Sequence, residues 1–146
     1  MIISIASGKG GTGKTTVATN LDLLLTDGPP GIGCPVIASL GGAASVLIVS
    51  EPTVSGRHDM ERVAELAAFF KIPTMLCVNK FDLNPDQGEA IEAFAREKNI
   101  NVIGRIPFNP AFTKGMVQGK TIVEFDGRSE GCEAVKNIWE NLVKDL

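Results

Sequence analysis

The sequence predicts a three-layer α/β domain built on a mostly parallel sheet of about five strands. Short apolar runs recur along the chain, and segments with helical spacing of apolar residues lie between them. Of the 146 residues, 44% are hydrophobic and 21% are charged, a balance typical of globular proteins. This length favours one folding unit, so we expect a single domain over residues 1–146.

Five apolar runs are the expected strands. They are rich in β-branched residues and apolar on both faces, as strands between two layers of helices are. The runs are Ile2–Ala6, Leu21–Thr26, Ser45–Ser50, Thr74–Asn79 and Asn101–Ile106. In a parallel sheet the residues that follow each strand meet at one edge, which is where α/β proteins bind ligands.

Three further segments have the apolar spacing of helices, namely Arg57–Phe70, Pro85–Lys98 and Ser129–Leu146. Asn84 precedes the second segment as the expected N-cap, and Pro85 suits the first helical position. One face of the third segment carries Val135, Ile138, Trp139, Leu142, Val143 and Leu146. We expect this apolar face to pack on the sheet.

Composition excludes several classes of protein. The net charge is −3 and no basic cluster occurs, which argues against a nucleic-acid surface. Three widely spaced cysteines fit a reducing compartment better than a disulfide framework. The chain start lacks the features of a secretory leader, and no window reaches the roughly 18 apolar residues of a membrane span. We therefore expect a cytoplasmic protein without a membrane span or a nucleic-acid partner.

The strongest motif is the Walker A sequence at Gly8–Thr16 (GKGGTGKTT), which satisfies G-x-x-x-x-G-K-[ST] and follows the first expected strand. Its glycines allow a tight turn that directs successive backbone N–H groups at one phosphate. The helix that should follow adds the partial positive charge of its N-terminus. The expected phosphate-binding residues are Gly10, Gly11, Thr12, Gly13, Lys14, Thr15 and Thr16.

Two side chains of this motif and one acid beyond it have expected roles in catalysis and metal binding. Lys14 should contact the β- and γ-phosphates, and the Thr15 hydroxyl should bind Mg²⁺. Asp27 follows the second apolar run, and a carboxylate at that end of a strand can hold the water shell of the metal. The sequence thus predicts Thr15 and Asp27 as the magnesium site, with Lys14 and Asp27 as catalytic residues.

The segment Asn79-Lys80-Phe81-Asp82 follows another expected strand and is the candidate for base recognition. An asparagine at this place can pair with the N6/N7 edge of adenine. The same Asn-Lys-x-Asp string is the guanine-reading motif of GTPases, in which the aspartate accepts hydrogen bonds from the base. A helix-capping role for Asp82 is a third interpretation. Taken alone, the Asn-Lys-x-Asp string therefore favours GTP, while Asn79 leaves adenine recognition open.

The motif at Gly8–Thr16 resembles the deviant P-loop of the MinD/ParA/nitrogenase-iron-protein family. The resemblance implies a P-loop NTPase fold, ATP with Mg²⁺, and a nucleotide-sandwich homodimer in which Lys9 reaches the phosphates of the partner. Asp27–Gly31 resembles the Asp-x-Pro-x-Gly loop with which this family senses the γ-phosphate. The family also favours ATP, with Asn79 at the base and Pro107 in the next base-flanking loop.

Within this family, the chain looks most like a MinD-like branch with an inserted ferredoxin domain. The similar segments include Asp27–Ser39, Glu51–Thr53, Asn79–Asn84 and Gly104–Phe108. In that branch, a second strand, a switch aspartate and a cysteine-rich insert follow the P-loop helix. Here Thr19-Asn20-Leu21 runs directly into Asp22, so the chain has an apparent internal deletion near residues 20–22.

The resemblance implies a MinD-like ATPase that acts as a nucleotide-dependent dimer switch and is linked to iron–sulfur or redox partners. The missing switch aspartate would orient the attacking water, so an ATP-binding module without significant hydrolysis is an alternative. A GTP-binding protein is another alternative. Cys34 lies seven residues after Asp27, near the offset of a cluster-ligating cysteine in the nitrogenase iron protein, although a buried structural thiol is the favoured interpretation.

Overall fold

The computed structural model describes residues 2–7, 24–30 and 34–145. Five strands form one parallel sheet in the order β2-β1-β3-β4-β5. The strands are β1 (Ile2–Ser7), β2 (Leu24–Pro30), β3 (Ser45–Ser50), β4 (Thr74–Asn79) and β5 (Asn101–Ile106). The last three match their predicted bounds, and the parallel α/β class is confirmed.

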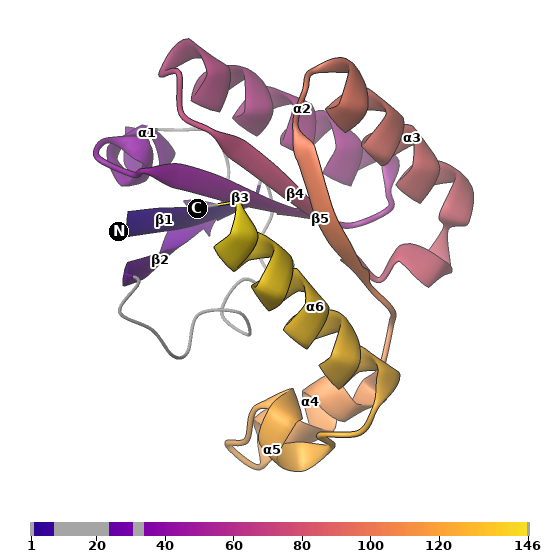
Figure 1. Ribbon diagram of the computed structural model, residues 1–146. Coiled ribbons are helices and arrows are strands. Elements are labelled where there is room, and N and C mark those ends of the chain that lie inside the picture. The colour runs from indigo at the N-terminus through magenta and orange to yellow at the C-terminus, as the bar shows by residue number, and fades with distance from the viewer. Residues whose placement is uncertain (1, 8–23, 31–33, 146) are drawn as a thin grey trace.

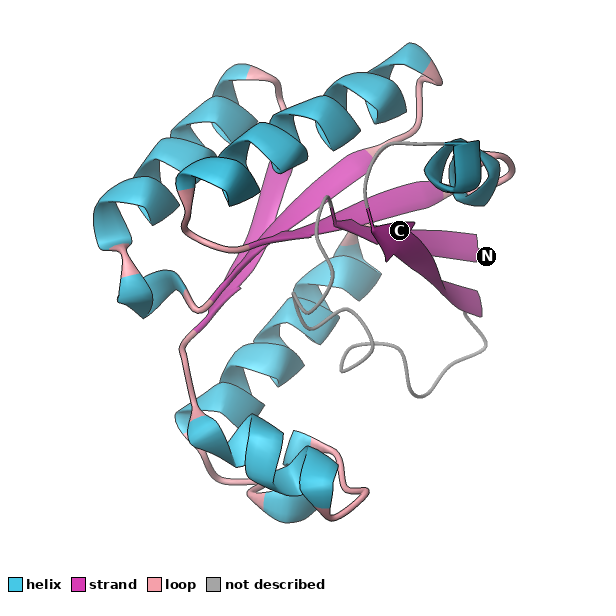
Figure 2. Ribbon diagram, turned by 180° about the vertical axis from the view of Figure 1, so that it is seen from behind, coloured by secondary structure: helices cyan, strands magenta, loops and turns pink. Residues whose placement is uncertain are grey.

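The helices are α1 (Cys34–Leu40), α2 (Val54–Phe69), α3 (Pro85–Glu97), α4 (Pro110–Val117), α5 (Ile122–Phe125) and α6 (Glu130–Lys144). Figure 1 shows α1, α2 and α3 over one face of the sheet and α6 across the other. The view from behind shows the same three layers (Figure 2). The predicted three-layer arrangement is therefore the one observed.

The two faces of the sheet bury alternate residues of the same strands, as a side-chain period of two requires. Val46 and Ile48 face the cluster that contains Met60 and Val63 of α2. Leu47 faces the opposite cluster, which also includes Val49, Met75, Cys77, Ile103, Ile138 and Leu142. Both faces of β3 are therefore covered, which explains why its six residues are all buried.

Helix bounds follow their capping residues. Asn84 accepts a hydrogen bond from the Gln87 N–H, as expected of the N-cap of α3, and Ser129 caps α6 in the same way. The prediction for α2 was wrong by three residues at its start, because Thr53 accepts from the Gly56 N–H and begins the helix at Val54. The short helix α5 was not predicted, and it begins with a capping box between Thr121 and Glu124.

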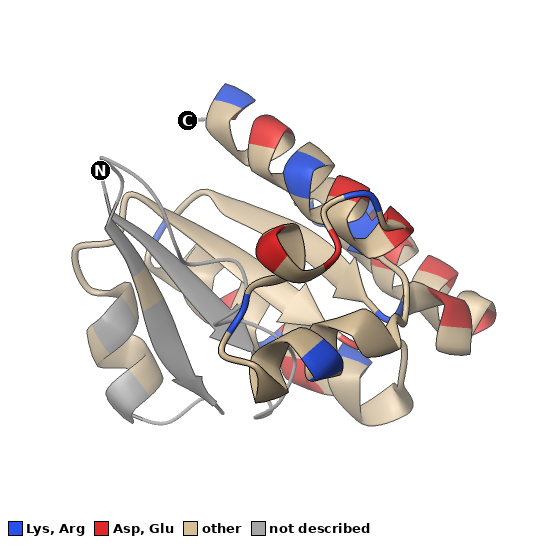
Figure 3. Cartoon of the chain, turned by 90° about the horizontal axis from the view of Figure 1, so that it is seen from below, with Lys and Arg blue, Asp and Glu red and all other residues tan. Residues whose placement is uncertain are grey.

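The apolar face of α6 packs on the sheet, as predicted, through the fully buried Ile138 and Leu142. Val143 was assigned to that face, yet it is exposed, since it lies at the margin of the apolar stripe. Acidic and basic residues are mixed along the outer surface of the helix (Figure 3). Leu146 lies outside the described residues.

The second strand differs from its prediction in a way that concerns the site. Leu21, Asp22 and Leu23 lie outside the described residues, and β2 continues past Thr26 to Pro30. Asp27 therefore pairs in register with Ile5 within the strand, and does not end it. The pairing shifts before Pro30 meets Ser7. Two prolines end β2, which is paired on one side only in the described sheet, and edge strands are where sheets accommodate proline.

Candidate functional site

The candidate site lies at the carboxyl edge of the sheet, where β1, β3, β4 and β5 all end. The Walker A motif begins at Gly8, directly after the last residue of β1, and β1 lies between β2 and β3. The motif itself lies outside the described residues. It includes the predicted Lys9, Gly10, Gly11, Thr12, Gly13, Lys14, Thr15 and Thr16.

The other predicted residues are described to different extents. The backbone of Asp27 lies in β2, and the structure does not describe its side chain. Asn79 is the last residue of β4 and pairs in register with Ile106. Pro107 follows β5 and is buried. Asn79 and Pro107 thus lie at the carboxyl ends of two adjacent strands, while their role at the base stays a prediction.

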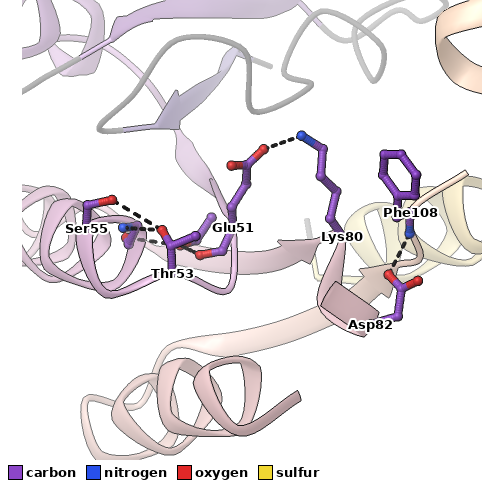
Figure 4. Close-up of polar contacts among 8 residues, drawn as sticks. Glu51, Thr53, Ser55, Lys80, Asp82 and Phe108 are labelled. Carbon is purple, nitrogen blue, oxygen red and sulfur yellow. Dashed lines mark hydrogen bonds and ion pairs between the residues drawn. The ribbon is translucent and has the colours of Figure 1, made fainter. Parts of the chain in front are cut away.

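An ion pair crosses this edge between β3 and β4. The Lys80 ammonium lies 2.6 Å from a carboxylate oxygen of Glu51, with the two side chains 33% and 19% exposed. Lys80 follows the last residue of β4 and has a left-handed backbone (φ 56°). Its side chain reaches Glu51, the residue that follows β3. Figure 4 shows the pair bridging the two strand ends. Neither residue was assigned a site role from sequence, although an acid directly after a strand was the available signal.

The start of α2 is held tightly against the end of β3. The Ser50 hydroxyl donates to the Gly56 carbonyl at 3.1 Å, and the Thr53 N–H donates to the Glu51 carbonyl at 2.8 Å. A Cβ added to Gly56 would lie 2.4 Å from that same Glu51 oxygen. Only glycine therefore lets the first turn of α2 approach so closely, and this approach sets where Glu51 lies.

Asp82 connects the loops that follow β4 and β5. Its Oδ1 accepts a hydrogen bond from the Phe108 backbone N–H at 2.6 Å (Figure 4). Asp82 lies in a short 3₁₀-helix (Phe81–Leu83) and does not supply the cap of that helix. The helix-capping interpretation was therefore wrong, because the carboxylate bonds a residue 26 positions away rather than a local N–H.

Arg105 of β5 forms an ion pair with Glu92 of α3 next to this edge of the sheet. The Arg105 Nε and Nη2 donate to the two carboxylate oxygens of Glu92 at 2.5 and 2.8 Å. Hydrogen bonds from Arg105 lower the pKa of Glu92 from its ordinary value. The Arg105 guanidinium also lies over the Phe81 ring, 5.5 Å from its centroid. Sequence reasoning missed these residues, because no local pattern reports a contact between a helix and a strand 13 residues away.

Two negative observations concern metal and membrane. Over the described ranges, His, Cys, Asp and Glu form no group of three or more that could hold a metal ion. Of the two predicted magnesium ligands, Thr15 lies outside the described residues, and Asp27 is described by its backbone alone. No described helix is both long enough and apolar enough to cross a bilayer.

The comparison with family models decides the family. The ParA model, described as the NUBPL iron-transfer P-loop NTPase, matches residues 19–143. The chain belongs to the ParA family of P-loop NTPases. The predicted MinD/ParA-like membership is thus confirmed, whereas the branch with an inserted ferredoxin domain stays a prediction.

Two curated proteins of one organism match most of this chain. The uncharacterized protein MJ0578 of Methanocaldococcus jannaschii is 30% identical over 125 residues, which are 83% of this chain and 40% of the relative. A second uncharacterized protein of that organism, MJ0579, is 23% identical, and the match covers 88% of this chain and 44% of the relative. The chain thus spans less than half the length of the curated relatives it matches.

Among solved structures, the cell division ATPase MinD of Pyrococcus furiosus superposes with a TM-score of 0.82 at 18% identity, covering 99% of each chain. MinD of Pyrococcus horikoshii, complexed with Mg-ADP, gives the same score at 17% identity, covering 98% of this chain and 96% of its own. At these identities the likeness concerns the fold alone.

Proposed function

We propose that this chain binds ATP with Mg²⁺ at the carboxyl edge of its sheet and acts as a MinD-like, nucleotide-dependent dimer switch. The observation that carries the proposal is topological. The strand that leads into the Walker A motif lies inside the sheet, and Asn79 and Pro107 lie on the same edge. Parallel α/β sheets bind their ligands at this edge.

Each predicted residue keeps a role in this proposal. The loop amides of Gly10–Thr16 and the Lys14 ammonium hold the phosphates, while Thr15 and Asp27 hold the magnesium. Asn79 and Pro107 border the base. Lys9 acts on the phosphates of a second copy, so the proposed unit of function is a homodimer. The single nucleotide-binding domain over residues 1–146 is part of the same proposal.

The contacts of Asp82 favour adenine over guanine. Reading guanine would require the Asp82 carboxylate to face the base N–H groups, whereas one of its oxygens accepts from Phe108 N–H. Lys80, the second residue of the Asn-Lys-x-Asp string, is bound to Glu51. GTP remains the alternative that the string itself favours, and base competition separates the two nucleotides.

Two alternatives concern hydrolysis: the chain either hydrolyses the bound ATP or only binds it. The family and the Mg-ADP in a structural neighbour support nucleotide chemistry. The segment expected to orient the attacking water is missing from the sequence, which supports a binding module without significant turnover. Phosphate release that stops in Lys14→Ala would support the ATPase, and a flat trace at saturating ATP would support the module.

Iron chemistry finds no support in the described side chains. The family description names iron transfer, and an iron–sulfur or redox partner was predicted. Cys77 and Cys132, however, are both buried, and Cys34 is described by its backbone alone, at the start of α1. Burial raises the pKa of the Cys77 thiol to about 12, and a protonated thiol is a poor metal ligand. We therefore leave this partner out of the proposed function.

The decisive experiment is a thermal-unfolding scan with Mg²⁺ and either ATP, GTP or neither. ATP at about 100 times its dissociation constant stabilises a protein by about 2.7 kcal/mol, which raises Tm by roughly 5–11 °C for this size. We expect this shift with ATP and its loss in Lys14→Ala. The absence of any shift with either nucleotide would refute nucleotide binding.

Lys9→Ala is the matched variant, because it changes a lysine of the same loop. If Lys9 acts across a dimer, this variant should keep most of the thermal shift and lose ATP-dependent association in analytical ultracentrifugation. Association that is unchanged in Lys9→Ala would remove its role in the partner site while leaving ATP binding intact.

A further inference from the structure

Glu92 of α3 is a buried carboxylate shared by two guanidinium groups. Its side chain is only 8% exposed, whereas those of Arg96 and Arg105 are 67% and 46% exposed. Arg105 binds both carboxylate oxygens, and Arg96 donates to one of them at 3.1 Å. A fork-to-fork arginine–carboxylate pair has a defined geometry as well as a favourable energy. Glu92 therefore fixes the orientation of the Arg105 guanidinium.

The oriented guanidinium holds Phe81. Arg105 comes from β5, the edge strand of the described sheet, and its guanidinium lies 5.5 Å from the centroid of the Phe81 ring. A cation over an aromatic face is attractive, and the planar guanidinium can also stack on the ring. Phe81 is two residues after Asn79 and precedes Asp82. The contact thus ties the loop after β4 to the side chain of the neighbouring strand.

Asp82 closes the arrangement by binding Phe108 N–H at 2.6 Å in the loop after β5. The loop after β4 is thus held at two places, to strand β5 through the Arg105–Phe81 contact and to the loop after β5 through the Asp82–Phe108 bond. We call the set Glu92, Arg105, Phe81, Asp82 and Phe108 the two-loop brace. Asn79 and Pro107, the proposed base neighbours, lie within the two segments that the brace joins.

We propose that Glu92 is a positioning residue for the nucleotide base, acting through Arg105 and Phe81 on the loop that follows Asn79 and on the segment that contains Pro107. This inference rests on the proposed function, since it names what sets the base-binding half of that site. The side-chain hydrogen bonds of Glu92 run to Arg96 on its own helix and to Arg105 on β5. Its effect reaches the base through a neighbour, and it should leave the phosphate half of the site unchanged, because no member of the brace belongs to the Walker A motif.

The test compares a ligand with a base and a ligand without one. Isothermal titration calorimetry measures the dissociation constants of Mg·ATP and of Mg·tripolyphosphate for the wild type and for Glu92→Gln. We expect Glu92→Gln to weaken ATP about tenfold, the equivalent of one lost hydrogen bond, and to change tripolyphosphate less than about twofold. A purely structural role would weaken both ligands together.

Three further variants keep the test valid if Glu92→Gln does not fold. Phe81→Leu removes the ring and keeps an apolar side chain, and Arg105→Lys keeps the charge and loses the fork. Both should weaken ATP selectively. Arg96→Gln is the matched control, because it removes a guanidinium from Glu92 without touching the Arg105–Phe81 contact. It should leave both dissociation constants within about twofold, whereas loss of ATP affinity in this control would indicate a general effect of the α3 charges.

The outcomes separate this inference from the proposed function. Selective loss of ATP affinity in Phe81→Leu and Arg105→Lys supports the positioning role. Equal loss of both ligands, or unchanged ATP affinity, overturns it while the wild-type affinity still supports ATP binding. A wild type that binds neither ligand overturns the proposed function, and the inference falls with it.

Discussion

Two glycines in comparable helix positions should respond oppositely to alanine. Gly56 is the third residue of α2 and Gly88 is the fourth of α3. Alanine favours a helix interior over glycine by about 1 kcal/mol, so both substitutions would stabilise the protein on propensity alone. The surroundings differ. A Cβ on Gly56 would lie 2.4 Å from the Glu51 carbonyl oxygen, whereas a Cβ on Gly88 would have its nearest neighbour at 3.8 Å.

The magnitude for Gly56→Ala follows from these contacts. A backbone carbonyl cannot rotate away, so the first turn of α2 must shift, at an overpacking cost of about 1–3 kcal/mol. The shift also strains the 2.9 Å N-cap bond between Gly56 N–H and Thr53, worth about 1 kcal/mol. After the propensity gain, we expect a net loss of about 1–3 kcal/mol. Gly88→Ala meets only ordinary van der Waals contacts and should gain about 0.5–1 kcal/mol.

Thermal unfolding followed by circular dichroism measures both effects. At roughly 2.1 cal/mol/K of unfolding entropy per residue, 1 kcal/mol corresponds to about 3 °C in a chain of this size. Gly56→Ala should therefore lower Tm by roughly 3–10 °C, and Gly88→Ala should raise it by about 1.5–3 °C. A higher Tm in Gly56→Ala would refute the reasoning, since it would mean that the close approach of α2 to β3 is not required.

Two further predictions concern buried titratable groups. The pKa of Glu92 is lowered from its ordinary value of 4.5, chiefly by its hydrogen bond with Arg105. The ionised Glu92 therefore stabilises the folded protein fully above about pH 4.5, and this stabilisation is lost as pH falls through the folded pKa. Urea unfolding at several acidic pH values should show a steeper loss of stability in the wild type than in Glu92→Gln, and parallel pH profiles would contradict this linkage. Burial raises the pKa of Cys77 to about 12, so iodoacetamide at mildly alkaline pH should label Cys77 only after unfolding. Peptide mass spectrometry reads the labelled site, and rapid labelling of the native protein would show that this thiol is accessible.

Local sequence patterns were sufficient to predict most of the regular elements. The bounds of β3, β4 and β5 were predicted correctly because buried strands between helix layers need uninterrupted apolar runs. The start of α3 was predicted because Asn84 and Pro85 act on the adjacent backbone. Family membership was also readable, since a Walker A motif depends on a continuous stretch of residues. Helices α1 and α4 were not predicted, because their short segments lack a repeated apolar face.

What the tertiary structure decided were the contacts between distant residues. Sequence spacing placed Asn79 and Pro107 at the ends of two strands, and only the sheet order made those strands neighbours. The Glu51–Lys80 pair joins residues 29 positions apart, and the Asp82–Phe108 bond joins residues 26 apart. A charged side chain has many possible partners in the sequence, so the residue type alone does not reveal which partner it binds in the folded protein. That choice is made when the core packs the strands in one register and brings their carboxyl ends to a common edge.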